Sequence, residues 1–195
     1  MKDTKDYILM TSLKLFMQKS FKEVTMKEIV EKTSLSKGAF YHYFASKEAV
    51  FEEVVKYFYS HIIVTDYSNF PQTSLKDFCK VYLDKLANSP YDIEDAGNET
   101  NLFGFISEAI RKIPSFMDIH KAQRKTEIDA WSNIVAIAKK NKEIKANFPN
   151  KDISAMFLNI SDGIVLNKMS TSDEEESLKG IKKGWGHLYK LLQKE

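Results

Sequence analysis

Only one cysteine, seven glycines and four prolines occur in the 195-residue sequence. The single cysteine, Cys79, excludes an internal disulfide and any metal site that needs several thiolates. One unpaired thiol is typical of a reducing compartment, so we expect a cytoplasmic protein with Cys79 as ordinary core packing. No apolar run approaches the roughly 18 residues that cross a bilayer. The N-terminus has no signal-peptide core, so we expect no membrane partner.

Signatures of catalysis and of metal binding are also missing. The sequence has no G-x-S-x-G elbow, no phosphate-binding loop and no G-x-G-x-x-G run. Its histidines fall in separate segments, and no two of them have the H-x-x-x-H spacing that places two ligands on one helix face. We therefore expect no enzyme, no cofactor and no metal.

Charge of one sign is not in large excess, because the net charge is only +2. The first 60 residues hold ten Lys or Arg against eight Asp or Glu, and the remainder is balanced. Nucleic-acid binding would therefore depend on where individual cations are placed. The scarcity of glycine and proline, together with the lack of a long alternating apolar pattern, predicts an all-α fold.

What the sequence does contain is a helix-turn-helix pattern over residues 25–47. Thr25, Ser36 and Ser46 are predicted N-caps of three short consecutive helices. In the second of these helices, Phe40 and Phe44 share one face and should pack inward. The other side is expected to meet base edges and phosphates in a major groove, through Lys37, Gly38, Tyr41 and His42. Lys47, in the first turn of the following helix, is expected to bind a phosphate.

These residues resemble the DNA-binding domain of the TetR/AcrR family of bacterial transcriptional regulators. The resemblance is carried by Thr25-Met26-Lys27-Glu28-Ile29, Ser36-Lys37-Gly38-Ala39-Phe40-Tyr41, Phe44 and Ser46-Lys47-Glu48. It implies that phosphates are held by Thr25, Lys27, Ser36, Tyr43 and Lys47, while bases or adjacent phosphates are met by Lys37, Gly38, Tyr41 and His42.

Apolar periodicity predicts about nine helices in total. We expect a three-helix helix-turn-helix domain over residues 1–47 and a helical ligand-binding and dimerisation domain over residues 48–195. The last two predicted helices are apolar enough to form a four-helix bundle with a second copy, as the family usually does. The interface residues expected there are Phe157, Ile160, Ile164, Ile181, Trp185 and Leu188. Alternatively, both helices simply close the core of the monomer.

The resemblance also implies a small-molecule pocket between helices of the second domain. Aromatic walls with a few polar tips suit such a pocket, and the candidates are Tyr82, Phe103, Phe105, His120 and Trp131. The expected function is a homodimeric repressor that binds a palindromic double-stranded DNA operator and is released by a small-molecule inducer. The alternatives are a DNA-binding dimer controlled by a partner protein, and a helical interaction module that binds no DNA. The inducer, the operator, the target genes and the sign of regulation are not encoded in this pattern.

Overall fold

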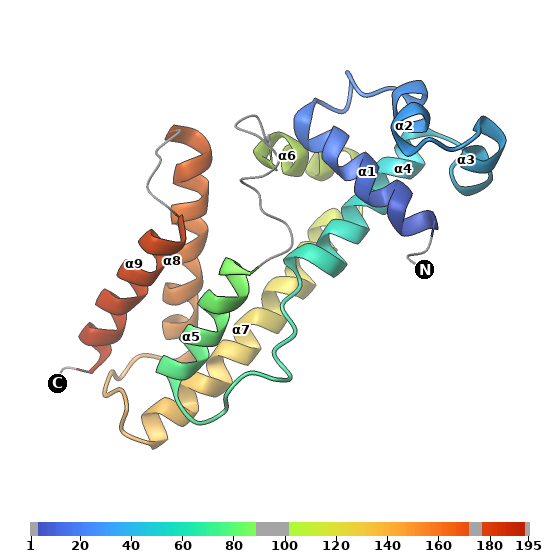
Figure 1. The fold of residues 1–195 in the computed structure, drawn as a ribbon. Coiled ribbons are helices and arrows are strands. Elements are labelled where there is room, and N and C mark those ends of the chain that lie inside the picture. The colour runs from blue at the N-terminus through green and yellow to red at the C-terminus, as the bar shows by residue number, and fades with distance from the viewer. Residues whose placement is uncertain (1–3, 89–101, 172–176, 194–195) are drawn as a thin grey trace. The chain divides into compact units, whose positions relative to one another are not determined.

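The computed structural model describes residues 4–88, 102–171 and 177–193, with the side chains at 102–103 and 168–171 outside the described part. These residues form helices only, which confirms the all-α expectation. The helices are α1 (Thr4–Gln18), α2 (Met26–Thr33), α3 (Lys37–Tyr43), α4 (Lys47–Phe58), the π-helix η1 (Tyr59–Ile63), α5 (Leu75–Ala87), α6 (Leu102–Lys112), α7 (Phe116–Lys140), α8 (Asn150–Thr171) and α9 (Ser177–Leu192). Figure 1 labels α1 to α9.

The chain divides into two compact units. The first comprises residues 1–64 and 91–121, and the second comprises residues 65–90 and 122–195, so that α7 contributes to both. The first unit therefore takes in α4, η1 and α6 in addition to the helix-turn-helix. The expected boundary after residue 47 does not coincide with the edge of this unit, because α4 packs along α1 in one shared core.

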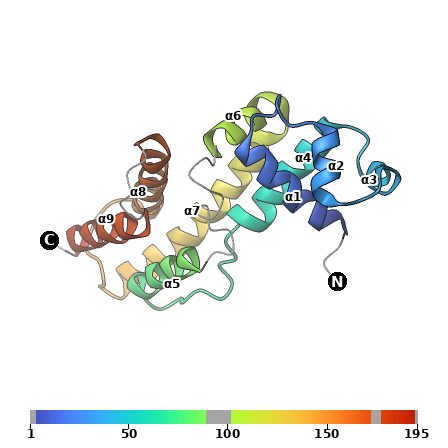
Figure 2. The ribbon, with the colours of Figure 1, turned by 45° about the horizontal axis from the view of Figure 1, so that its top comes forward.

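The core of the first unit is built around α1, which Figure 2 shows beside α4. Ile8, Leu15 and Phe16 recur on one side of α1 and are buried, as helical periodicity predicts. The Phe16 ring meets the Phe51 ring of α4 edge-to-face, with centroids 4.9 Å apart. This geometry is favourable for aromatic pairs, and it fixes the two helices that support the helix-turn-helix.

The core of the second unit is dominated by aromatic rings. Trp131 of α7 is fully buried, and its ring centroid lies 5.1 Å from that of Phe78 in α5 and 5.0 Å from that of Trp185 in α9. The Trp185 indole also donates a hydrogen bond to the backbone oxygen of Phe157 in α8, at 2.7 Å. These contacts join α5, α7, α8 and α9 into one unit.

Three of the six expected dimer residues belong to this core and not to an outer surface. Phe157, Ile181 and Trp185 are at most 2% exposed within the monomer, so a contact of these three with a partner stays a prediction that the monomer surface does not support. Their side chains pack against α7 and against each other within the subunit. This packing agrees with the alternative expectation that α8 and α9 close the core of the monomer. The other three, Ile160, Ile164 and Leu188, are half-buried.

Candidate nucleic-acid interface

Three hydroxyl side chains begin the short helices of the first unit, as the sequence predicts. The side-chain oxygens of Thr25, Ser36 and Ser46 each accept a hydrogen bond from the backbone N–H three residues later, at 3.1, 3.2 and 3.1 Å. Each bond satisfies a donor that a helix start leaves without an internal partner. Ser34 lies in the left-handed region, with φ 55°, and ends α2 there. Local chemistry thus sets where α2, α3 and α4 begin.

Helix α3 separates similar aromatic residues onto two sides. Phe40 and Phe44 are 0% and 3% exposed, and their ring centroids lie 6.0 Å apart in the core. Tyr41 and Tyr43 are 48% and 40% exposed. A tyrosine can stack through its ring and hydrogen-bond through its hydroxyl, so the outer side of α3 is a candidate contact surface.

Eight of the nine residues expected to meet DNA are exposed, namely Thr25, Lys27, Ser36, Lys37, Gly38, Tyr41, His42 and Tyr43. The Lys27 side chain is 81% exposed and its ammonium lies 3.8 Å from the Glu31 carboxylate, a surface pairing that holds it only weakly. Among the described residues, none forms an ion pair or hydrogen bond with the Lys37 ammonium. Both cations are therefore free to bind an external anion.

Gly38 lies in the first turn of α3 and leaves open space on its outer side. A Cβ atom built there would have no heavy atom within 4 Å, so packing within the protein does not require a glycine. Glycine lowers the stability of a helix interior, and its presence is explained if another surface approaches closely. A DNA backbone beside the first turn of α3 would be such a surface.

Lys47 lies in the first turn of α4, as expected, but its ammonium is bound within the protein. Its ammonium donates hydrogen bonds to the backbone oxygens of Phe21 and Val24, both at 2.7 Å. It also lies 4.4 Å from the centroid of the Phe21 ring. Since two of its three donors are engaged, its role in the free protein is to tie the start of α4 to the segment before α2. A phosphate contact by Lys47 stays a prediction.

Phe21 is the residue here that sequence reasoning missed. Its ring carries a second cation, because the ammonium of Lys112 from α6 lies 4.2 Å from the centroid. Phe21 thus links α6 to the start of α4 through its two lysine neighbours. The position of Phe21 just before a predicted N-cap was visible in the sequence. Its partners are 26 and 91 residues away, and no local pattern identifies them.

The residues expected to line one ligand pocket fall into two separate groups. Phe105 and His120 belong to the first unit, whereas Tyr82 and Trp131 belong to the second. The side chain of Phe103 lies outside the described residues. A ligand site at these residues stays a prediction.

The group in the second unit is accompanied by polar atoms without partners. The ring centroids of Tyr82 and Trp131 lie 5.6 Å apart. Within the described part of the chain, the Gln123 amide nitrogen is buried without a hydrogen-bond partner. The Tyr67 hydroxyl lies beside the Trp131 indole and Thr65 and interacts with both, but neither Tyr67 nor Trp131 makes a hydrogen bond of normal geometry there. Nearby, burial raises the pKa of Glu127, although the positive charge of Arg124 opposes this. Buried polar atoms without partners are rare and call for an explanation such as water or a ligand.

Cys79 lies in α5 beside this core. Burial raises the pKa of its thiol, and the charge of Glu143 adds to the effect. Because the thiolate is the reactive form, such a thiol is a poor nucleophile. The arrangement favours the packing role expected for Cys79.

The sequence over residues 8–54 matches the family described as bacterial regulatory proteins, tetR family. The match covers α1 to α3 and much of α4, which are the helices that carry the surface described above.

Two curated relatives are uncharacterized HTH-type transcriptional regulators of Bacillus subtilis (strain 168). YuxN is 44% identical over 59 residues, which are 30% of this chain and 20% of YuxN. YfiR is 24% identical over 174 residues, which are 89% of this chain and 84% of YfiR. The chain thus aligns with only about a fifth of the first relative and with most of the second.

A solved structure with the same fold is that of Escherichia coli NemR in its reduced form. It has a TM-score of 0.69 at 18% identity, and the alignment covers 97% of this chain and 98% of NemR. At this identity the likeness concerns the fold alone. Among the described residues, no helix is both long and apolar enough to cross a membrane.

Proposed function

We propose that this chain is a transcriptional regulator of the TetR family that acts as a repressor in the cytoplasm. It binds a palindromic operator as a homodimer and is released by a small molecule held in the second unit. The observation that supports DNA binding most directly is the outer side of α3. There Lys37 has no partner among the described residues, Gly38 faces open space and Tyr41 is half exposed.

The proposed complex places α3 of each subunit in a major groove. A two-fold dimer places its two recognition helices about 34 to 36 Å apart, one turn of DNA, when the half-sites are adjacent. The exposed side chains of Lys27 and Tyr43 then bind phosphates, and those of Lys37 and Tyr41 reach bases. The modest net charge of +2 means that affinity depends on these placed groups more than on a general field.

The proposed inducer binds beside Tyr82 and Trp131. Support comes from the buried Trp131 indole, Tyr67 hydroxyl and Gln123 amide, which make no hydrogen bond of normal geometry among the described residues and would gain one from a ligand with an oxygen acceptor. Such a ligand shifts the dimer only as far as it binds the released conformation more tightly than the DNA-bound one. Cys79, with its raised pKa, does not supply the signal through thiol chemistry.

The experiment that tests this function is selection of bound sequences from a random duplex library at two salt concentrations. An enriched palindrome that is retained at the higher salt is the expected result. Binding that vanishes as salt rises, without enrichment, would leave only electrostatic attraction and contradict the proposal.

Variants of the selected complex separate the two kinds of contact. Lys37→Ala or Tyr41→Ala should cost about 1 to 3 kcal/mol and relax the sequence preference, whereas Lys27→Ala should weaken all sequences alike and lower the salt slope by about one. Lys47→Ala is unsuitable for this comparison, because it also removes the two hydrogen bonds that hold the start of α4. Equal losses on operator and random DNA for all three useful variants would exclude α3 as the recognition helix.

A further inference from the structure

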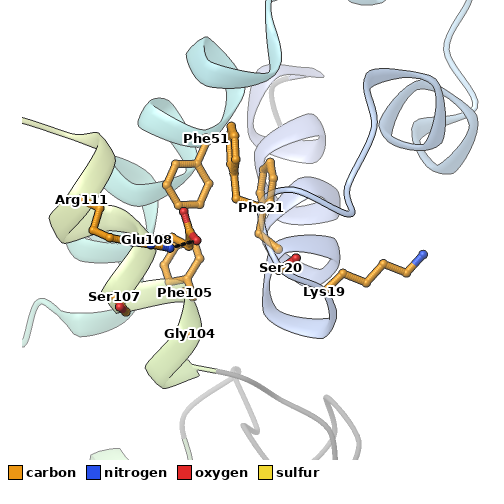
Figure 3. A pocket seen from close by; sticks show the side chains of 10 residues that line it. Lys19, Ser20, Phe21, Phe51, Gly104, Phe105, Ser107, Glu108 and Arg111 are labelled. Atoms are coloured by element: carbon orange, nitrogen blue, oxygen red, sulfur yellow. Dashed lines mark hydrogen bonds and ion pairs between the residues drawn. The ribbon is translucent and has the colours of Figure 1, made fainter.

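The first unit contains a cavity of its own, which the proposed repressor function does not use. Its volume is about 270 Å³, and its lining comes from the end of α1, the segment after it, α4 and α6. Figure 3 shows the side chains around it. We call it the α1–α6 cavity, and its lining residues are Phe16, Lys19, Ser20, Phe21, Phe51, Gly104, Phe105, Ser107, Glu108 and Arg111.

Aromatic rings form the inner walls of the α1–α6 cavity. Phe16, Phe51 and Phe105 are each 2% exposed, and Phe21 is 7% exposed. The rings are held rigidly by one another, since the centroids of Phe21 and Phe51 lie 5.0 Å apart and those of Phe51 and Phe105 lie 5.5 Å apart. Apolar cavities of about 150 Å³ can bind benzene. The α1–α6 cavity is therefore large enough for a single aromatic ring with a substituent.

One polar atom in the lining needs a donor. The Glu108 side chain is 18% exposed and bonds to Arg111 through Oε1. Its Oε2 atom is buried and has no hydrogen-bond partner among the described residues. The Lys112 ammonium lies 4.0 Å from Oε2, which is close enough for a weak ion pair but too far for a hydrogen bond. A buried acceptor left without a donor is unfavourable, and a donor supplied by a ligand would correct this.

The charges around the α1–α6 cavity restrict what that ligand can be. Among the lining residues, Arg111 is paired with Glu108, and Lys19 is paired with Glu28 outside the lining. Lys112 stands beside Glu108 as well, and Lys47 and Lys112 lie over the Phe21 ring. A cationic ligand would add to this group of positive charges. An anionic ligand would face the Glu108 carboxylate at the one atom that needs a partner. An uncharged donor avoids both penalties, and its bond to a carboxylate is of the strong, charge-assisted kind.

We propose that the α1–α6 cavity binds an uncharged, single-ring aromatic compound that donates a hydrogen bond from a hydroxyl or N–H group to Glu108 Oε2. The site is independent of the proposed inducer site in the second unit. Its occupant contacts Phe21, whose backbone oxygen accepts a hydrogen bond from Lys47 at the start of α4. The compound therefore touches a residue that holds the helix-turn-helix in place.

The test uses the full chain and four probes of similar size, observed by ¹⁹F NMR. The probes are 4-fluorophenol, 4-fluoroanisole with its hydroxyl methylated, 4-fluorobenzoate as an anion and 4-fluorobenzylamine as a cation. We expect 4-fluorophenol to bind at least about tenfold more tightly than each of the others, a ratio that one lost charge-assisted bond accounts for. No binding of 4-fluorophenol, or equal binding of 4-fluoroanisole, overturns the proposal.

A variant then locates the site. Glu108→Gln keeps the size of the side chain and removes the carboxylate, so the preference for 4-fluorophenol over 4-fluoroanisole should fall at least about fivefold. The matched control is Glu52→Gln in α4, an exposed carboxylate that pairs with Lys56 at 3.0 Å and lies outside the cavity lining. If Glu108→Gln leaves the preference for 4-fluorophenol over 4-fluoroanisole unchanged, the probe binds elsewhere and the proposal is wrong. The four-probe comparison on the unaltered chain decides the matter even if the variant does not fold.

Discussion

Three lysines of the helix-turn-helix region have different roles that their sequence context does not distinguish. The Lys37 ammonium has no partner among the described residues, and Lys27 has a weak surface pairing. Lys47 is instead bound to two backbone oxygens and lies over the Phe21 ring. A lysine that must break internal hydrogen bonds to reach a phosphate binds that phosphate more weakly than a lysine that has none to break. Lys37 has no such bond among the described residues, and Lys27 would lose only its weak surface pairing with Glu31.

Gly38→Ala is expected to affect the stability of the protein and its affinity for the operator in opposite directions. The added methyl group meets no heavy atom within 4 Å, and alanine is favoured over glycine in a helix by about 1 kcal/mol. We therefore expect a higher thermal midpoint and weaker operator binding, because the methyl group reduces close approach of the DNA. Thermal denaturation and an operator titration measure the two effects.

Gly186→Ala in α9 is the control for this variant. It also meets no heavy atom within 4 Å, and it lies outside the helix-turn-helix. It should raise stability without changing operator affinity. If Gly38→Ala binds the operator as tightly as the unaltered chain, DNA does not approach this part of α3 closely.

Among the elements, α8 and α9 are packed together through glycine. A Cβ atom on Gly184 would lie 2.8 Å from Cγ2 of Ile160, and one on Gly180 would lie 3.3 Å from Cγ2 of Ile164. Glycines four residues apart lie on the same side of a helix. The side of α9 that carries Gly180 and Gly184 therefore packs closely against Ile160 and Ile164 of α8. These isoleucines, expected at a dimer interface, are used in part for packing within the subunit.

Gly184→Ala should destabilise the second unit by about 1 to 3 kcal/mol, because the branched side chain of Ile160 must move to avoid overpacking. Gly186→Ala, two residues away with open space, should instead stabilise it by about 0.5 to 1 kcal/mol. Urea denaturation followed by tryptophan fluorescence measures both, since the two tryptophans of the chain, Trp131 and Trp185, lie in this unit. If both variants change the free energy of unfolding in the same direction, α8 and α9 do not pack as closely at Gly184 as the structure indicates.

Glu143, between α7 and α8, caps the start of α5. Its carboxylate accepts hydrogen bonds from the backbone N–H groups of Leu75 and Lys76, both at 2.9 Å, and from the Tyr189 hydroxyl at 2.9 Å. Burial alone would raise the pKa of Glu143, but these bonds and one from Ser74 outweigh it and lower the pKa. One carboxylate thus joins α5 and α9 at the same end of the second unit.

The lowered pKa makes the second unit sensitive to acid. Because the folded state binds the proton less tightly than the unfolded state, the stabilisation is complete above the ordinary pKa of 4.5 and is lost as pH falls through the folded value. Glu143→Gln should cost about 1 to 2 kcal/mol at pH 7, allowing for partial solvent exposure, and should lose less stability on acidification. Urea midpoints at several pH values measure this. Glu31→Gln, an exposed carboxylate of α2, should follow the unaltered chain.

For the whole molecule, the proposed homodimer needs a surface that the monomer core does not consume. On α8 the outer residues Met156, Gly163 and Leu166 are exposed, with Met156 and Leu166 at 37% and 50%. Met156 and Gly163 are seven residues apart, and Leu166 follows three residues later, so they occupy one stripe of the helix. This stripe is the part of α8 that we propose for the contact with a second copy.

Gly163→Arg tests the stripe. A side chain at this position meets no heavy atom of the subunit within 4 Å, so the monomer should fold, while a dimer with close helix crossing should dissociate at least about tenfold more readily. Sedimentation equilibrium measures the change. Ala122→Arg, on an exposed position of α7, should leave the association unchanged, and equal behaviour of both variants would exclude this side of α8.

The parts of the molecule that were predicted correctly depend on neighbours in the sequence. The N-caps at Thr25, Ser36 and Ser46, and the inward turn of Phe40, follow from interactions within four residues. The core to which an aromatic residue belongs was not predictable, because Phe105 and Trp131 are equally apolar but lie in different cores. Nothing local indicates which distant ring each of them meets.

The sequence by itself determined that the chain is helical, where its short helices begin, and which surface of α3 remains exposed, since hydrogen bonds at helix ends and apolar periodicity act over a single turn. Only the tertiary structure decided that Lys47 is bound at Phe21, that Trp185 faces inward and that Phe105 lines the α1–α6 cavity. These outcomes depend on close packing between segments far apart in the chain, where many apolar residues compete for the same space.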